Sequence, residues 1–287
     1  MTEPQSSSIF PRLQVDWTTV GMMRVCCVAF IVVTMIFLPY PEIDLWVAEI
    51  FYYGNNDFWL RKTEFNVILN DFIRPAVRYV AIGGLLAFLY FWWRAPLDRV
   101  RKLARYAFFL ICIALASGLV VHAVLKDNWG RARPKHVVQF DGEQVFTPPL
   151  LPVNECERNC SFVSGDSSLG FVFLSFALYA ARHRRFWISL TVASGLALGL
   201  MRMMNGSHFF SDILYSGIFT CFTVLLLYRW FEEKRFKQDA GILYPAFAAF
   251  GSLVFQIFEK LPVPPEKRAE FYARSRALFT DPPDEAA

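Results

Sequence analysis

The most informative stretch of the sequence is residues 201–212, which read MRMMNGSHFFSD. It lies between two apolar segments, so we expect its polar side chains near a membrane surface. His208 and Asp212 would be neighbours on one turn of a helix. Asp212 can then hold one ring nitrogen of His208 and leave the other free to attack, as in a catalytic triad. Taken alone, the stretch fits equally well an interfacial histidine beside a carboxylate at a helix start.

The composition is that of an integral membrane protein. Hydrophobic residues make up 55% of the chain, charged residues make up 19%, and 30 of the 287 residues are Phe. Several apolar runs approach the roughly 20 residues that a spanning helix needs. The net charge of +4 is modest, and the basic residues lack the interleaved aromatic residues of a nucleic-acid-binding face. We therefore expect neither a soluble domain nor a nucleic-acid partner.

The apolar runs predict an all-α, polytopic protein with a six-helix transmembrane bundle. Residues 42–75 are mixed in character and are expected to form amphipathic helices in the membrane interface. Basic clusters follow the second, fourth and sixth spans, and the positive-inside rule puts that side and both termini in the cytoplasm. The expected spans are residues 20–38, 79–93, 106–125, 167–181, 186–203 and 211–228.

These spans belong to one membrane domain, residues 20–238, between two terminal segments. Residues 1–19 are expected to be a cytoplasmic tail, and residues 239–287 a cytoplasmic segment. The apolar run at 241–258 could be a seventh span, but the proline and glycine that interrupt it favour a helix lying in the interface. No small-residue cleavage site follows the first span, which favours a membrane anchor over a removed signal peptide.

In this topology four separated polar clusters reach the outer face of the membrane. Ionisable groups at span ends mark a functional site by default. The first cluster, KDNWGRARP at residues 126–134, separates Lys126 from Arg133 by about two helical turns, so the two would project together as an anion clamp. Arg131 and Lys135 would add to it and suit a highly anionic headgroup. The alternative is a belt of snorkelling basic residues at a span end.

The second cluster is SGDS at residues 164–167, which opens the fourth span. Free backbone N–H groups at a helix start bind anions, and glycine lets a ligand approach closely. An ordinary N-cap is the alternative, because Ser and Asp are preferred there. The other two clusters are Arg202, whose planar donors suit phosphate, and His208.

Together these motifs resemble the type-2 phosphatidic acid phosphatase superfamily, which also includes bacterial acid phosphatases and vanadium haloperoxidases. Residues 126–134 fit K-x6-R-P, residues 164–165 fit the centre of P-S-G-H, and residues 202–212 fit R-x5-H-x3-D. The resemblance covers the third to sixth spans. It implies the membrane lipid phosphatase branch: a helical bundle and a phosphatase that uses no metal and no cofactor.

The resemblance also implies a role for each matched residue. His208 would be the nucleophile that forms a phosphohistidine, and Asp212 would orient it. The phosphate oxygens would be bound by the cations and by further donors, which are Lys126, Arg133, Arg202, Ser164 and Gly165. Phosphoryl transfer needs such cations around an in-line nucleophile, so the chemistry agrees with these roles.

Three positions depart from the family pattern. Val163 replaces proline and Met201 replaces serine, which removes one hydroxyl donor. Asp166 stands where the family has the histidine that protonates the leaving oxygen. We hypothesise that Asp166 is the general acid and that the pH optimum is acidic; water or His136 are the alternatives.

Three further features lie near the expected site. Cys156 and Cys160 are candidates for a disulfide if the outer side is the oxidising periplasm. His122 lies one turn before Lys126, where it would either hydrogen-bond within the site or bond within its own helix. The loop at residues 135–162 is expected to cap the site and shape substrate choice.

We therefore predict a multi-pass lipid phosphatase of the bacterial inner membrane with its site facing the periplasm or outer leaflet. Family analogy suggests phosphatidic acid, phosphatidylglycerophosphate, polyprenyl diphosphate or a lipid A phosphate as substrate. No required protein partner is evident. A phosphotransferase with the same nucleophile is one alternative. A non-catalytic lipid-binding protein that has lost its chemistry through Asp166 is another, whereas haloperoxidation does not suit so fully embedded a protein.

Overall fold

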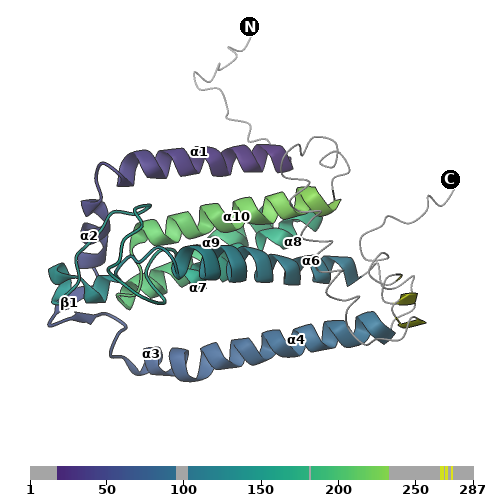
Figure 1. Cartoon of the computed structure of the whole chain (residues 1–287), viewed down its shortest axis with the longest axis horizontal. Coiled ribbons are helices and arrows are strands. Elements are labelled where there is room, and N and C mark those ends of the chain that lie inside the picture. The colour runs from purple at the N-terminus through teal and green to yellow at the C-terminus, as the bar shows by residue number, and fades with distance from the viewer. Residues whose placement is uncertain are drawn as a thin grey trace, which may run out of the picture.

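The computed structural model describes residues 18–94, 103–180 and 182–232, and a few positions between 266 and 273. The predicted apolar run at 241–258 and nearly all of the tail at 1–19 lie outside the described residues. Helices dominate the described part (Figure 1). The elements are α1 (Thr19–Phe37), α2 (Glu42–Glu49), β1 (Tyr52–Gly54), β2 (Asp57–Phe58), α3 (Glu64–Ile68), η1 (Leu69–Ile73), α4 (Arg74–Arg94), α6 (Ala104–Cys112), η3 (Ile113–Lys126), η4 (Pro134–His136), η5 (Val138–Phe140), α7 (Gly165–Phe171), α8 (Leu174–Tyr179), α9 (Arg184–Met204) and α10 (Phe210–Glu232).

All six predicted spans fall on helical segments, but not all meet the criteria for a membrane span. Among the described residues, four helices are long and apolar enough to cross a membrane: Thr19–Phe37, Tyr106–Lys126, Arg184–Met204 and Phe210–Trp230. In α4 only the shorter stretch Ile82–Phe91 is apolar enough. The fourth expected span is split into α7 and α8, where Phe173, Ser175 and Phe176 each donate to the carbonyl three residues before.

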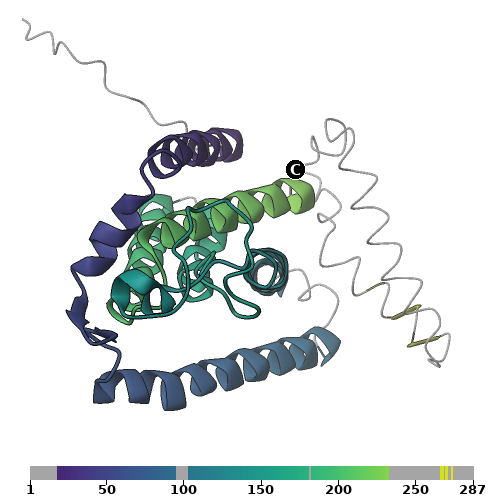
Figure 2. The same cartoon turned by 60° about the vertical axis from the view of Figure 1, so that its left-hand side comes forward.

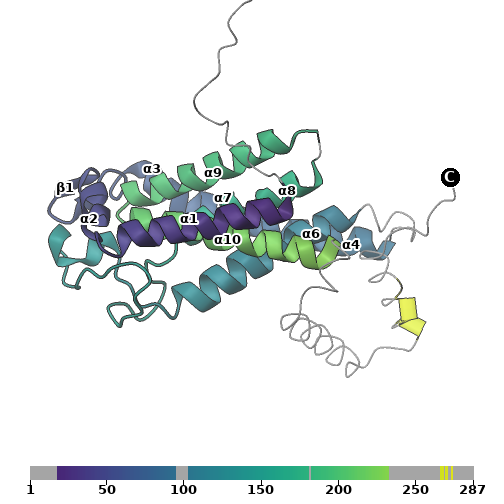
Figure 3. The same cartoon turned by 90° about the horizontal axis from the view of Figure 1, so that it is seen from above.

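The centre of the bundle is α10. It packs against α1, α7, η3 and α9, and Figure 3 shows α1 lying along it. Within its apolar window 56% of the residues are buried, against 22% to 33% in the other three spanning helices. By contrast, α4 runs along the edge of the bundle (Figure 2). The central helix of the bundle is therefore α10, which begins two residues after His208.

Two glycines bring α7 and α9 into close contact. A Cβ atom at Gly170 would lie 2.5 Å from the backbone nitrogen of Gly195, so only glycine fits there. Two serine hydroxyls tie the helices at the same point: Ser167 Oγ donates to the Gly195 carbonyl at 2.6 Å, and Ser194 Oγ donates to the Gly170 carbonyl at 3.1 Å. This contact fixes the start of α7 against α9.

The polar segments collect at one end of the bundle, on the left of Figure 1. Here α2, the β1–β2 hairpin and the loop at residues 141–163 surround the start of α10. Residues 42–75 were expected to be amphipathic helices, but they also contain this antiparallel hairpin, and α2 packs onto α10. In the loop, Cys156 and Cys160 form a disulfide bond with their Cα atoms 5.6 Å apart.

Candidate active site

His208 is completely buried in the turn between α9 and α10. The chain reverses at Gly206, whose φ of +63° favours glycine. Ring nitrogen Nδ1 lies 2.7 Å from the carbonyl oxygen of Ser161 and 3.8 Å from Oδ2 of Asp212. The sequence analysis expected Asp212 itself to hold this nitrogen, but 3.8 Å is too long for a hydrogen bond. Because a carbonyl only accepts, it keeps the proton on Nδ1 and leaves Nε2 without one.

Asp212 acts on His208 through a shared neighbour. Its Oδ2 accepts hydrogen bonds from the Ser161 hydroxyl at 2.6 Å and from the Phe209 backbone N–H at 2.9 Å. Ser161 thus binds both members of the pair, with its hydroxyl on Asp212 and its carbonyl on His208. Sequence reasoning missed Ser161, because nothing in its local pattern distinguishes it from the other polar residues of the loop.

Arg131 is completely buried behind this pair. Its guanidinium donates to Asp212 Oδ1 at 2.6 Å and to Asp44 Oδ2 at 2.8 Å, and its Nε donates to the Thr147 carbonyl at 2.9 Å. Its charge also lies over the ring of Phe209, 4.5 Å from the centroid. The expectation that Arg131 would contact an anionic headgroup is wrong, because two carboxylates already surround it.

Asp44 is a second residue that sequence reasoning missed. It lies in the first turn of α2 and is completely buried. Besides Arg131, it accepts a hydrogen bond from the Ser211 backbone N–H at 2.8 Å. Aspartates are common in the first turn of a helix, where they interact favourably with the helix dipole. The sequence around Asp44 therefore gave no sign of this long-range contact. Asp44, Arg131 and Asp212 therefore form a closed ion network beneath the histidine.

Nε2, the other ring nitrogen of His208, is the candidate reactive atom. It is buried and has no hydrogen-bond partner within the described part of the chain. The pKa of His208 is lowered to about 3, mainly by burial and also by the charges of Lys126 and Arg133, against the opposing effect of Asp212. The ring is therefore neutral at pH 7, and Nε2 carries the lone pair that a nucleophile needs.

The predicted phosphate-binding cations lie near His208. Lys126 ends η3 and is 7% exposed, and Arg202 lies in the last turn of α9 and is 4% exposed. Arg133 donates through Nε and Nη2 to the Asn159 carbonyl, at 3.1 and 2.6 Å. The sequence analysis placed Lys126 and Arg133 on one helix face, but the helix ends at Lys126 and the chain turns at Gly130, where φ is +68°. Both charges nevertheless reach His208.

Lys135 extends this positive region. Its backbone N–H donates to the carbonyl of Gly206 at 3.0 Å, close in sequence to His208. Burial lowers the pKa of Lys135 to about 8, and the charges of Arg133, Arg61 and Arg202 contribute. Three arginines therefore act on the charge of Lys135, and this local concentration of positive charge favours the binding of an anion.

The second motif forms the helix N-cap that was the alternative to an anion site. Ser164 caps α7, since its hydroxyl oxygen accepts from the Ser167 N–H at 3.4 Å, and its own N–H donates to the Asp212 carbonyl at 3.2 Å. Asp166 forms an ion pair with Arg202, 3.0 Å from Nε. Gly165 lies directly against the ring of His122. The motif therefore joins η3, α9 and α10 at the site.

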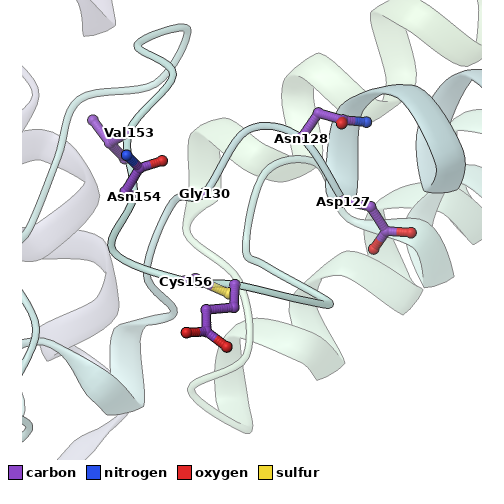
Figure 4. Close-up of a pocket in the computed structure, with 7 residues that line it drawn as sticks. Asp127, Asn128, Gly130, Val153, Asn154 and Cys156 are labelled. Carbon is purple, nitrogen blue, oxygen red and sulfur yellow. The ribbon is translucent and has the colours of Figure 1, made fainter.

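A pocket of about 300 Å³ opens beside the site (Figure 4). It is lined by Asp127, Asn128, Gly130, Val153, Asn154, Cys156 and Glu157. With two carboxylates and no cation in its lining, it would repel a phosphate and is not the phosphate site. Among the described residues, no group of three or more His, Cys, Asp or Glu side chains could hold a metal ion.

A buried neutral imidazole, supported by a carboxylate network and faced by several cations in a helical bundle, is the arrangement of a membrane phosphatase. The profile of the PAP2 superfamily matches residues 105–236. The chain belongs to this superfamily, in its membrane lipid phosphatase branch.

Named relatives lie in the same branch. The lipid A 4'-phosphatase of Francisella tularensis subsp. novicida (strain U112) is 36% identical over 205 residues, which cover 69% of this chain and 90% of that protein. The lipid A 4'-phosphatase of Rhizobium etli is 25% identical over 250 residues, 81% of this chain and 96% of that protein. A lipid A 1-phosphatase of Rhizobium etli is 33% identical over 126 residues, 42% and 50% of the two chains. No solved structure gives a significant match.

Proposed function

We propose that this enzyme removes a phosphate from lipid A, at the 4' position. The relatives that it matches over most of their length carry that activity in their names, whereas the 1-phosphatases match over about half. The observation that carries phosphate chemistry is the buried Nε2 of His208, which has no hydrogen-bond partner among the described residues and lies within reach of the charges of Lys126 and Arg133. A lipid phosphate is an anion of the kind that these positive charges would attract.

In the proposed reaction, Nε2 of His208 attacks phosphorus in line with the leaving oxygen. Lys126, Arg133 and Arg202 bind the phosphate oxygens, whose charge they stabilise in the transition state. Asp212 keeps the Ser161 carbonyl in place and stabilises the positive charge that develops on the ring. Water then hydrolyses the phosphohistidine and releases phosphate. Gly165 and Ser164 remain the proposed neutral donors at the start of α7.

The proposed location is the inner membrane, with the site facing the periplasm. Two features support it. The disulfide between Cys156 and Cys160 lies in the loop over the site and suits an oxidising compartment. The other end of the bundle carries Arg94, Arg184 and Arg229, at the ends of α4, α9 and α10, as expected of the cytoplasmic side (Figure 1).

The test uses the full-length enzyme in detergent with lipid A as substrate. We expect release of inorganic phosphate, and we expect mass spectrometry to show loss of the 4'-phosphate with the 1-phosphate retained. Radiolabelled substrate should give an acid-labile phosphoenzyme in the wild type and none in His208→Ala. Label recovered on a second lipid would instead identify a phosphotransferase, and intact lipid A beside a dephosphorylated glycerolipid would reject the substrate.

A further inference from the structure

The proposed reaction needs a proton for the leaving oxygen, and the residue at the expected position is poorly suited to give it. Asp166 occupies that position, but its carboxylate is 3.0 Å from Nε of Arg202, which is 4% exposed. A carboxylate in such an ion pair gains most in its charged form, because the arginine stabilises the negative charge. Asp166 is thus arranged to position Arg202 rather than to donate a proton.

His122 offers a second ring at the same motif. A Cβ atom at Gly165 would lie only 2.5 Å from Nε2 and 2.5 Å from Cε1 of His122, so this edge of the ring rests on the glycine. Nδ1 of His122 lies 2.7 Å from the Ser117 carbonyl. Since a carbonyl only accepts, Nδ1 carries a proton, and any second proton resides on Nε2 beside Gly165.

The position of His122 connects it to the nucleophile. His122 lies one turn before Lys126 on η3. The charge of Lys126 in turn acts on His208. The segment at residues 161–165 links the two histidines directly, because it holds Nδ1 of His208 through Ser161 and contacts His122 through Gly165. The ring of His122 is exposed, so a substrate oxygen can reach it.

The other histidine near the site is less suitable. His136 lies in η4 beyond Lys135, and burial lowers its pKa, as do the charges of Lys135 and Arg133. It is therefore poorly protonated at neutral pH. His122 instead lies directly against Gly165, in the motif that carries the expected acid position.

We propose that His122 is the catalytic acid that protonates the leaving oxygen, in place of the histidine that Asp166 replaces. The proposal rests on the phosphatase reaction above. As the bond from phosphorus to Nε2 of His208 forms, the bond from phosphorus to the substrate oxygen breaks, and that oxygen takes the Nε2 proton of His122. Water then attacks phosphorus as the bond to His208 breaks, its protons leave with the phosphate, and His122 regains its proton from the solvent. Both rings return to their starting states.

The test compares two soluble single-chain substrates of equal chain length. One is an alkyl phosphate, whose alkoxide leaving group needs a proton. The other is an alkyl-substituted nitrophenyl phosphate, whose leaving group departs without one. His122→Asn retains a donor where Nδ1 lies, and so preserves the bond to Ser117 while removing the acid. His183→Asn is the matched control, because His183 is exposed at the opposite end of the bundle, before α9.

In the full-length enzyme, we expect His122→Asn to slow alkyl phosphate hydrolysis by about 10²- to 10³-fold and nitrophenyl phosphate hydrolysis by no more than about threefold. Retained nitrophenyl turnover shows that the variant is folded. Equal losses on both substrates, in His122→Asn and in His122→Gln, would overturn the proposal, as would a selective loss in His136→Asn instead. Failure of the wild type on both substrates and on lipid A would reject the proposed phosphatase reaction itself.

Discussion

Arg131 and Arg133 are two residues apart in one motif, yet they belong to two different regions of the molecule. Arg131 is completely buried between the carboxylates of Asp44 and Asp212. Arg133 lies near the other cations, and its guanidinium donates to a neutral carbonyl, that of Asn159. We call the first region the ion network and the second the cation face, the latter made of Lys126, Arg133, Lys135 and Arg202.

The difference shows how one type of side chain serves two purposes. In the ion network the positive charge of Arg131 lies between carboxylates and fixes the position of Asp212. Asp212 in turn positions His208 through Ser161. On the cation face several positive charges lie near Lys135, and this concentration of positive charge favours an anionic ligand. Such a concentration of like charges costs stability and is typical of functional sites. Substitutions in the ion network should therefore lower stability, whereas substitutions on the cation face should lower activity.

The largest effect is expected where the two regions meet. His208→Ala removes the proposed nucleophile, and we expect the rate of phosphate release to fall on the order of 10⁴-fold or more. The fold should persist, because the loss of one neutral ring leaves the ion network in place. Activity assays paired with size-exclusion profiles check this. Appreciable turnover by a well-folded His208→Ala would remove His208 from the reaction.

The second-largest effect is expected from a substitution that breaks the ion network. Arg131→Met leaves Asp44 and Asp212 buried without their cation, which should cost about 3 to 5 kcal/mol in the free energy of unfolding. Thermal unfolding in detergent should show a much lower midpoint than in the wild type. Adding Asp44→Leu should recover part of the loss, since it removes one of the two buried charges. If Arg131→Met were as stable as the wild type, the network would not be structural.

The ion network also marks the limit of what could be predicted from the sequence. Hydropathy located the helices, and the spacing of the motifs predicted a site at His208 and the three main cations, since both are local properties. The partnership of Asp44 with Arg131 depends on α2 folding back onto α10, and that of Ser161 with His208 depends on the path of a long loop. Arg131 and Arg133 look alike in sequence because burial, which separates them, is a tertiary property.

A smaller effect is expected on the cation face. Arg133→Met removes a cation that we propose stabilises the transferring phosphate, so we expect kcat to fall by about 10²- to 10³-fold. The unfolding midpoint should stay near that of the wild type, in contrast to Arg131→Met two residues earlier. Measuring both quantities for both variants sharpens the comparison. A large loss of stability in Arg133→Met would place this residue in the structural region.

The smallest effect is a pH dependence that belongs to the cation face. The pKa of Lys135 is lowered from its ordinary value to about 8, so the side chain is mostly charged at pH 7 and loses its proton as the pH rises through 8. If its charge attracts the anionic substrate, KM should rise roughly fivefold between pH 7 and pH 9, as expected of one partly exposed cation. Lys135→Arg keeps its charge across this range and should keep KM low, while Lys135→Met should have the raised KM already at pH 7. An unchanged rise of KM in Lys135→Arg would assign the titration to another group. In the ion network no such dependence is expected in this range, because Arg131 retains its proton far above pH 9.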